Sequence, residues 1–286
     1  MPPVYHAFSS FTFYVRLPIM EINPLLSLFD HEQRIAIEEP GMRKDVLPDV
    51  VRFVRPAPGM SFILYHRLDE SRADAAIQEQ VSYFTQINQP FEWKVYDHDS
   101  PPGMVEKLQA HGFVVEDPDA VMCLDLESAP ASLLKPIQAD VRPITRPDKL
   151  EDVIAVESQV WGRDFSWIRS RQGEHLAIPG YLNIYVAYAD GIPACTGWVY
   201  FHPHSPFADL WGGSTVEAYR GQGLYTAILA VRVQEAIRRG VRYLVIDASP
   251  MSRTILEKHG FQLLTYAHAC EWQPPVTEFG AGQRNP

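Results

Sequence analysis

The segment EAYRGQGLYTAIL, residues 217–229, places Arg-Gly-Gln-Gly where a strand is expected to become a helix. An apolar run, FADLWGGSTV, precedes it, and the apolar residues that follow recur close to helical spacing. Gly221 and Gly223 would let the backbone turn sharply and let a ligand approach closely. The following helix would present unpaired N–H groups and the positive end of its dipole, with Arg220 beside it. The sequence therefore predicts a phosphate or pyrophosphate site at this junction.

The elements that would position this junction follow from the patterns around it. Strand-like runs lie at 139–145, 183–202, 208–216, 241–249 and 262–272, of which 183–202 is a hairpin turning at Asp190-Gly191. Helical spacing predicts helices at 147–162, 167–176, 223–237 and 253–259. This succession of strands and helices predicts an α/β protein (α+β, with a mixed sheet).

Two stretches of the chain repeat each other. DSPPGMVEKLQAHGF, residues 99–113, aligns without gaps with DASPMSRTILEKHGF, residues 247–261, which is 148 residues further on. The same spacing places the helical run 75–89 over 223–237. We interpret the repeat as a duplication of one fold within the chain.

The duplication and the composition of the junctions predict the organisation of the chain. The segment LESAPASLLKP has the Ser, Ala and Pro content of a linker. The expected parts are an extension at 1–19, a first domain at 20–126, a linker at 127–137, a second domain at 138–275 and a tail at 276–286. The extension is aromatic but interrupted by His6 and Arg16, so we expect it to be poorly ordered, and Met20 is a plausible second start.

Composition limits the classes of function. The 286 residues are 46% hydrophobic and 21% charged, which is typical of a soluble globular protein with a sizeable core. A net charge of −10 argues against nucleic acid as the main partner, and no segment has the length and character of a membrane span. Cys123, Cys195 and Cys270 are widely spaced, which favours reduced thiols in a cytoplasmic protein over a metal site.

At residues 220–225 the chain resembles the GNAT superfamily of N-acetyltransferases. The signature of that family, Gln/Arg-x-x-Gly-x-Gly/Ala, lies between its fourth strand and its third helix. Here the frame reads Arg-Gly-Gln-Gly-Leu-Tyr, in which Arg220 and Gly223 match and Tyr225 replaces the small final residue. The resemblance covers about residues 141–272. Together with the repeat it implies two GNAT-like domains in tandem, each a central mixed, mainly antiparallel sheet flanked by helices.

The resemblance implies that acetyl-CoA, the acyl donor, binds at this turn without a metal. The strand edge would hydrogen-bond the pantetheine arm, the turn would hold the pyrophosphate, and a serine stands roughly where the family has an asparagine that contacts pantetheine. The residues implied are Ser214, Thr215, Arg220, Gly221, Gln222, Gly223, Leu224, Tyr225 and Ser249.

The first half supplies an internal comparison. At the spacing of 148, Arg220-Gly221-Gln222-Gly223 falls on Arg72-Ala73-Asp74-Ala75. Alanine would hinder the close approach of a ligand, and Asp74 would oppose a pyrophosphate. We therefore expect a degenerate first domain that has lost its cofactor site.

The catalytic residues are less sharply indicated. The tyrosine that the family often uses as general acid is replaced by Leu256, which leaves Tyr225 as a candidate acid or as a side chain packed on its helix. Asp209 is the candidate base because the family often places a carboxylate on this strand; the alternative is a solvated strand-end carboxylate. Glu157 could line the acceptor site, but a position on the helix surface is favoured.

Two histidines and four tryptophans of the second half are expected to have structural rather than functional roles. His202 and His204 flank Pro203 without a nearby Cys or acidic cluster, so a loop role is favoured over zinc binding. The tryptophans of the second half are expected in the core rather than in an aromatic cage; they are Trp161, Trp167, Trp198 and Trp211.

The prediction is an acyl-CoA-dependent N-acetyltransferase. It would transfer an acetyl group to a primary amine of a small molecule or peptide by direct attack in a ternary complex, as a monomer or homodimer. The alternative is a non-catalytic acyl-CoA-binding or interaction module, which the substitution at Leu256 and the degenerate first half favour.

Overall fold

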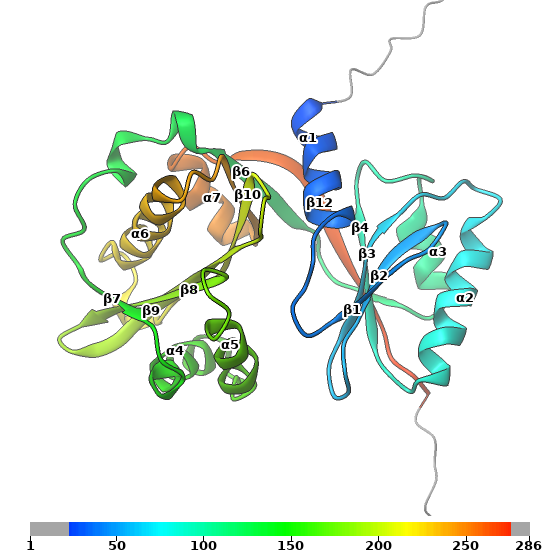
Figure 1. Ribbon diagram of the computed structural model, residues 1–286, viewed down its shortest axis with the longest axis horizontal. Helices are drawn as coiled ribbons and strands as arrows, with labels where there is room; N and C mark the ends of the chain where they lie inside the picture. Colours follow the sequence, from blue (N-terminus) through cyan, green and yellow to red (C-terminus); the bar gives the residue numbers. More distant parts are fainter. Residues whose placement is uncertain (1–22, 276–286) are drawn as a thin grey trace, which may run out of the picture.

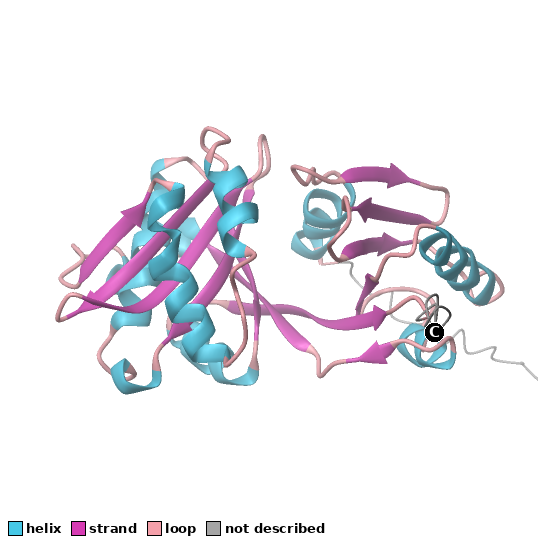
Figure 2. Ribbon diagram, turned by 90° about the horizontal axis from the view of Figure 1, so that it is seen from below, coloured by secondary structure: helices cyan, strands magenta, loops and turns pink. Residues whose placement is uncertain are grey.

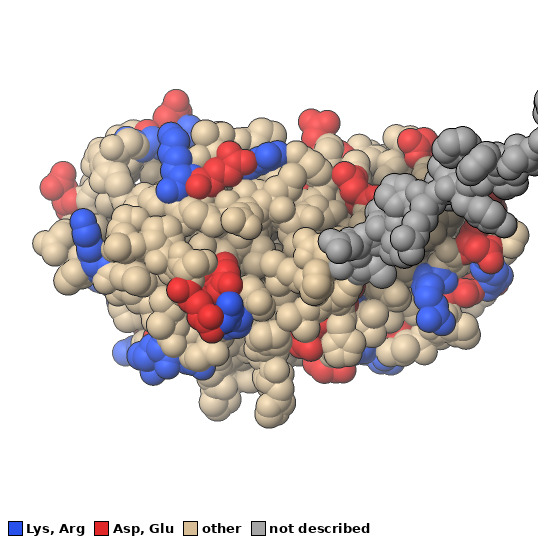
Figure 3. Space-filling view, turned by 90° about the horizontal axis from the view of Figure 1, so that it is seen from above, with Lys and Arg blue, Asp and Glu red and all other residues tan. Residues whose placement is uncertain are grey.

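The structure is a computed structural model that describes residues 23–275 (Figure 1). The predicted extension at 1–19 and tail at 276–286 lie outside the described residues. No helix in the described range is long and apolar enough to cross a membrane. On the face shown in Figure 3, acidic and basic side chains are interspersed over a mainly uncharged surface, so this face has no continuous basic patch.

Each half of the chain contributes a set of alternating strands and helices. The first half comprises α1 (Pro24–Phe29), the π-helical turn η1 (Asp30–Ile35), β1 (Arg43–Val46), β2 (Val50–Val54), β3 (Ser61–His66), α2 (Ala73–Gln86), β4 (Phe91–Tyr96), α3 (Met104–Ala110), β5 (Val114–Val115) and β6 (Asp119–Asp125). The connection contains the short turns η2 (Leu126–Ser128) and η3 (Ala131–Leu133). The second half comprises β7 (Asp140–Ile144), η4 (Pro147–Lys149), α4 (Leu150–Trp161), α5 (Ile168–Leu176), β8 (Leu182–Ala189), β9 (Ile192–Phe201), β10 (Phe207–Thr215), η5 (Glu217–Tyr219), α6 (Leu224–Arg238), β11 (Tyr243–Ala248), α7 (Pro250–Lys258) and β12 (Gln262–Trp272).

The strands form one continuous mixed sheet in the order β1-β2-β3-β4-β12-β6-β11-β10-β9-β8-β7, with β5 paired to β12. Most neighbours are antiparallel, and the parallel pairs are β3 with β4 and β10 with β11. Apolar side chains of α6 and α7 pack on one face of the second half's sheet, and those of α4 and α5 pack on the other (Figure 1). The predicted α/β fold with flanking helices is confirmed.

The two halves exchange their last strands, which the sequence patterns did not predict. β6, from the first half, pairs with β11 of the second half. β12, from the second half, pairs with β6 along Gln262–Ala267 and then with β4 along Ala267–Trp272. These two long strands cross between the halves in Figure 2. The proposed boundaries near residues 126 and 138 therefore do not separate two closed sheets.

The predicted linker at 127–137 packs against the second half. Leu133 is fully buried in the core beneath α6. The Gln234 side chain of α6 donates hydrogen bonds to the carbonyls of Leu133 and Lys135, both at 2.8 Å. This segment is consequently anchored to the helix that begins at the glycine turn.

The structure refines the alignment of the two halves. His111 and His259 end α3 and α7 and are 148 residues apart, as the repeat predicts. α2 is preceded by Arg72 and α6 by Gly223, which are 151 residues apart. The predicted alignment of the glycine turn with residues 72–75 is therefore wrong by three residues, because 73–75 already belong to α2. The turn corresponds instead to residues 69–72.

Within this turn of the first half, Asp69 satisfies the backbone with its own carboxylate. Its Oδ1 accepts hydrogen bonds from the N–H groups of Ser71 at 2.9 Å and Arg72 at 3.0 Å. The hydroxyl of Ser71 donates to the same oxygen, and these hydrogen bonds lower the pKa of Asp69. The first half thus places an internal anion where the second half has open backbone.

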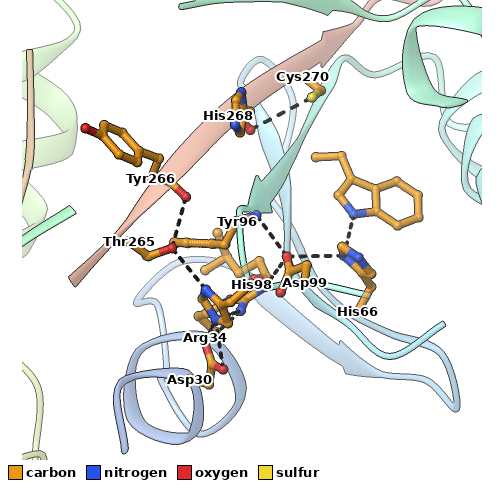
Figure 4. Close-up of polar contacts among 12 residues, drawn as sticks. Asp30, Arg34, His66, Tyr96, His98, Asp99, Thr265, Tyr266, His268 and Cys270 are labelled. Atoms are coloured by element: carbon orange, nitrogen blue, oxygen red, sulfur yellow. Dashed lines mark hydrogen bonds and ion pairs between the residues drawn. The ribbon is translucent and has the colours of Figure 1, made fainter. Parts of the chain in front are cut away.

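A buried arginine joins η1 to the sheet near the strand crossing (Figure 4). Arg34 is fully buried and donates to Asp30 at 2.7 Å, to Asp99 at 2.8 Å and to the carbonyl of Leu64 at 2.8 Å. His98 contacts Asp30 through one ring nitrogen and the hydroxyl of Thr265 in β12 through the other. The network therefore connects η1, the segment after β4 and the crossing strand.

Replacement of Arg34 by alanine is expected to lower the free energy of unfolding by about 3–5 kcal/mol, because two partly or fully buried carboxylates would lose their cation. Urea unfolding followed by circular dichroism measures the change. Arg43→Ala is the matched control, since Arg43 pairs with Asp45 at the surface, where an ion pair contributes little to stability. Equal effects of the two variants would contradict the structural role of Arg34.

Candidate functional site

The site begins where β10 separates from β11. β10 pairs with β11 only from Phe207 to Asp209, whereas its pairing with β9 extends from Ala208 to Thr215. Between Trp211 and Ser214 the register on β9 shifts, and Gly212 adopts a positive φ of 59°. Beyond Asp209, the edge of β10 that faces β11 is therefore free to hydrogen-bond an extended ligand.

The glycine turn follows this open edge. Gly221 and Gly223 have φ values of 76° and 79°, and a Cβ at either position would meet nothing within 4 Å. The positive φ values, rather than steric crowding, therefore favour glycine at these two positions. The space next to their Cα atoms is open. Gly223 caps α6 without any side-chain hydrogen bond, and the first bond inside the helix runs from the Ala227 N–H to the Gly223 carbonyl. The first N–H groups of α6 are thus available to an anion.

The other residues predicted for the cofactor lie around this turn. Arg220 and Gln222 are exposed and contact only backbone carbonyls, those of Thr215 and Ala218. The hydroxyl of Ser214 donates to Glu157 and that of Thr215 contacts Cys195, so both hydroxyls already have partners inside the protein. Leu224 is buried in the core, so only its N–H could serve.

Ser249 and Leu256 lie on the other side of the opening, in and before α7. The Ser249 hydroxyl caps α7 by accepting from the Ser252 N–H, although the side chain is exposed at the end of β11. Leu256 is fully buried in the main core. A tyrosine at that position would overpack this core, so Leu256 is a packing residue in this chain.

Tyr225 lies beneath the bulge of β10. A Cβ at Gly213 would come within 2.9 Å of its ring, and its hydroxyl is buried with no partner among the described residues. Burial raises the pKa of this phenol. The geometry places the hydroxyl near the fully buried Arg232, which donates to the carbonyls of Trp198 and Trp211.

Asp209 lies at the point where the two strands separate, on the sheet face opposite α6. His202 contacts its Oδ2 at 3.0 Å. The Gln33 amide, in the orientation that satisfies both of its ends, donates to the two carboxylate oxygens at 2.9 and 3.2 Å. Burial lowers the pKa of His202, but Asp209 outweighs this and the net direction is upward. The sequence interpretation of His202 as a loop residue missed its contact with Asp209. Local patterns also could not show that Gln33, from the first half, donates to Asp209.

Glu157 is not on the helix surface, contrary to the sequence interpretation. Its side chain is 2% exposed and its Oε2 accepts from Trp161 and from Ser214, both at 3.0 Å. Oε1 is buried without a partner among the described residues. Burial raises the pKa of this carboxyl to about 7. The apolar spacing of α4 did not show that the helix is buried at Glu157 as well as at its apolar positions.

Replacement of Glu157 by glutamine is expected to stabilise the protein increasingly between pH 5 and pH 8. A carboxyl whose pKa is raised in the folded state destabilises that state as pH rises above its ordinary value of 4.5. One pKa unit corresponds to about 1.4 kcal/mol, so the effect has an upper limit of about 3.5 kcal/mol. Melting temperatures across this pH range test it, with the exposed Glu174→Gln as the control. A constant difference between Glu157→Gln and the parent protein would contradict the assigned pKa.

The tryptophans of the second half are mostly not in the core. Trp198 is buried as predicted, whereas Trp161, Trp167 and Trp211 are 58%, 42% and 51% exposed. Trp211 pairs directly across from Trp198 on β9. The core prediction is thus wrong for three of the four.

The three cysteines of the chain lie within the described range. Cys123, Cys195 and Cys270 are buried free thiols. Burial raises the pKa of each, to about 12, 11 and 12 respectively. Among residues 23–275, no group of three or more His, Cys, Asp or Glu is placed to hold a metal ion.

No family model matches this sequence, and no curated protein is significantly similar to it. Solved structures do match. A GCN5-related N-acetyltransferase from Kribbella flavida superposes with a TM-score of 0.63 at 15% identity, covering 85% of this chain and 93% of that one. A functionally unknown conserved protein from Staphylococcus epidermidis gives 0.60 at 12% identity, covering 84% and 96%. A tandem GNAT protein from the clavulanic acid biosynthesis pathway gives 0.55 at 15% identity, covering 87% of each chain.

These similarities extend over both halves. At such identities they establish the fold: the chain has the GNAT fold in its tandem arrangement. The resemblance inferred from residues 220–225 is confirmed at this level.

Proposed function

We propose that the protein transfers the acetyl group of acetyl-CoA to a primary amine. The observation that carries the proposal is the combination of an unpaired strand edge with an uncapped helix N-terminus at a positive-φ glycine turn. These features fit a ligand that has an extended amide-containing arm and a pyrophosphate. Acetyl-CoA has both, and it supplies the acyl group as a thioester.

The chain's own groups then have distinct tasks. The β10 edge at Ser214 and Thr215 would align the pantetheine arm, and the N–H groups of Gly223, Leu224 and Tyr225 would hold the pyrophosphate. Asp209, supported by His202 and Gln33, would accept the proton that the attacking amine loses. A carbon–nitrogen bond forms as the carbon–sulfur bond breaks, and the thiolate leaves as a tolerable leaving group that water or Tyr225 can protonate.

Release of free thiol from acetyl-CoA in the presence of a panel of amines is the direct test. We expect amine-dependent release that scales with protein and requires an intact turn. Tight CoA binding without release for any amine would instead support the alternative of a non-catalytic acyl-CoA-binding module.

The stoichiometry is expected to be one CoA per chain. Asp69 already accepts from two N–H groups of the equivalent turn in the first half and places a negative charge there, so we expect only the second half to bind a pyrophosphate. Isothermal titration calorimetry should give one site that the second-half variant Gly223→Asp removes and Ala75→Asp, in α2, leaves intact. Two equivalent CoA sites would contradict the proposal that the first half has lost its CoA-binding site.

A further inference from the structure

The bulge of β10 lies directly beyond the point where this strand leaves β11. The last pair with β11 is at Asp209, and the register on β9 shifts between Trp211 and Ser214. A β-bulge bends its strand and increases the local twist. The bulge therefore accounts for the separation of the two strands, and the side chains that hold the bulge also keep the edge of β10 open.

The two glycines of the bulge are packed against aromatic rings. A Cβ at Gly212 would overlap the ring of Trp198, and a Cβ at Gly213 would lie 2.9 Å from the ring of Tyr225. Trp198 belongs to β9, and Tyr225 belongs to the first turn of α6. The backbone can follow this path only because neither residue has a side chain, so the surroundings of the bulge set its shape.

Arg232 of α6 holds the bulge from one face of the sheet. Its Nη1 donates hydrogen bonds to the carbonyls of Trp198 and Trp211, both at 3.3 Å, and these two residues are paired across β9 and β10. A Cβ at Gly197 of β9 would come within 3.1 Å of Cζ and Nη1 of the arginine, so the glycine makes room for the guanidinium group. Arg232 thus supplies a donor to two carbonyls at the register shift.

Glu157 of α4 holds the bulge from the other face, because α4 and α6 pack on opposite sides of the sheet (Figure 1). Its Oε2 accepts from the Ser214 hydroxyl and from Nε1 of Trp161, both at 3.0 Å. Trp161 also donates to the Ser214 hydroxyl, at 3.1 Å. These three side chains are therefore mutually hydrogen-bonded at the residue where regular pairing with β9 resumes.

Both side chains are unfavourable to bury. Arg232 is fully buried, its Nη2 has no hydrogen-bond partner among residues 23–275, and burial lowers its pKa. Glu157 is 2% exposed, and its Oε1 is likewise without a partner in that range. Apolar side chains of similar volume would usually stabilise a core as well or better. Buried polar groups of this kind are typical of functional sites, so their contacts with the bulge favour a role beyond folding.

We propose that Arg232 and Glu157 are positioning residues, which hold the β10 bulge from opposite faces and so keep the strand edge at Ser214 and Thr215 in place for acyl-CoA. The inference rests on the proposed binding of acetyl-CoA to this edge. Both side chains act through β10: Arg232 through the carbonyl of Trp211, and Glu157 through Ser214.

Calorimetry with CoA and the full-length protein at pH 8 tests the role of Glu157. Glu157→Leu removes the acceptor of Ser214 and Trp161 and should weaken CoA binding by about tenfold or more, which equals the loss of one or two hydrogen bonds along the edge. Its melting temperature should stay the same or rise, because a buried carboxyl with an unpaired oxygen is removed. Glu157→Gln keeps an acceptor for both donors and should bind CoA within about twofold of the parent protein. A purely structural role would not separate affinity from stability in this way.

Arg232→Met tests the other face, and Arg232→Lys restores one donor. The first variant should weaken CoA binding by about tenfold or more, and the second should weaken it less. Arg52→Met in the first half is the matched control for the loss of a buried arginine. Arg52 donates to Asp45 at 2.9 Å and to Gln80 at 3.0 Å, on strand β2 near the far end of the sheet. This control should retain the CoA affinity of the parent protein although it loses comparable hydrogen bonds.

Hydrogen exchange followed by mass spectrometry gives a measurement that does not depend on CoA. In Arg232→Met and Glu157→Leu, the peptide that covers residues 209–216 should exchange at least about tenfold faster than in the parent protein, while peptides of β2 and β3 exchange at the parent rate. Affinities for CoA equal to that of the parent protein in both variants would overturn the inference and leave the acetyltransferase assignment standing. Failure of the parent protein to bind CoA would refute the proposed function, and the exchange rates would then decide whether the two side chains hold the bulge.

Discussion

The Gly223→Asp variant is expected to lose CoA binding. Gly223 has a φ of 79°, and its position before α6 leaves the first N–H groups of that helix open. An aspartate at this N-cap position would accept from those N–H groups itself, and its charge would oppose a pyrophosphate. Loss of two hydrogen bonds to a charged ligand, at about 1.5–3 kcal/mol each, weakens binding by about 100-fold or more.

Calorimetry with CoA measures this loss, and Gly240→Asp provides the control. Gly240 has a similar φ of 74° and follows the other end of α6, and a Cβ at this position would meet nothing within 4 Å. Both variants therefore place a non-glycine residue in the left-handed backbone region, which costs about 1–2 kcal/mol. Only the residue at position 223 would face the anion. If the two variants bind CoA equally well, the turn is not the pyrophosphate site.

The glycine turn was predictable because its physical requirement is local. A positive φ favours glycine, and an anion needs a helix N-terminus, so Gly221, Gly223 and the following apolar spacing indicate the site without tertiary information. The alternation of strands predicted the mixed sheet for the same reason. Asp209 was predicted as a base from its place on the strand before the turn, and this role stays a prediction.

The strand exchange was not predictable, since the residues of β6 and β12 suit an antiparallel neighbour in either half. Cys123 pairs with Val245 in the observed sheet, yet nothing in its own stretch distinguishes β11 from β4 as the partner. The duplication contributes to the ambiguity, because equivalent strands in the two halves have similar patterns. Which strand becomes the neighbour depends on how the two halves are connected in space, and the local pattern of a strand does not report this.

The residues that surround Asp209 were missed for a related reason. Gln33 is 176 residues away from it in sequence and belongs to no motif of its own. Glu157 and His202 were judged by their local element, a helix and a loop, whereas their burial is set by the face of β10 that they meet. The first half therefore supplies a side chain, that of Gln33, to the surroundings of Asp209 in the second half.

The Asp209→Asn variant is expected to lower kcat by about 10²- to 10⁴-fold, the usual contribution of a general base, with CoA affinity unchanged. Asparagine keeps the size of the side chain and can still accept from Gln33 and His202, so folding should persist.

The charge that raises the pKa of His202 would be lost, and the remaining burial favours the neutral imidazole. In the parent protein, kcat/KM should rise with pH as His202 loses its proton, at a pH above the ordinary histidine range because the pKa of His202 is raised. In Asp209→Asn the residual activity should show this rise at lower pH, because His202 then releases its proton more easily. The measurement is kcat/KM from pH 5 to 9 with a working acceptor, and the exposed Asp148→Asn is the control. A full-activity Asp209→Asn variant, or one whose acidic limb stays in place, would show that the proton leaves the amine by another route.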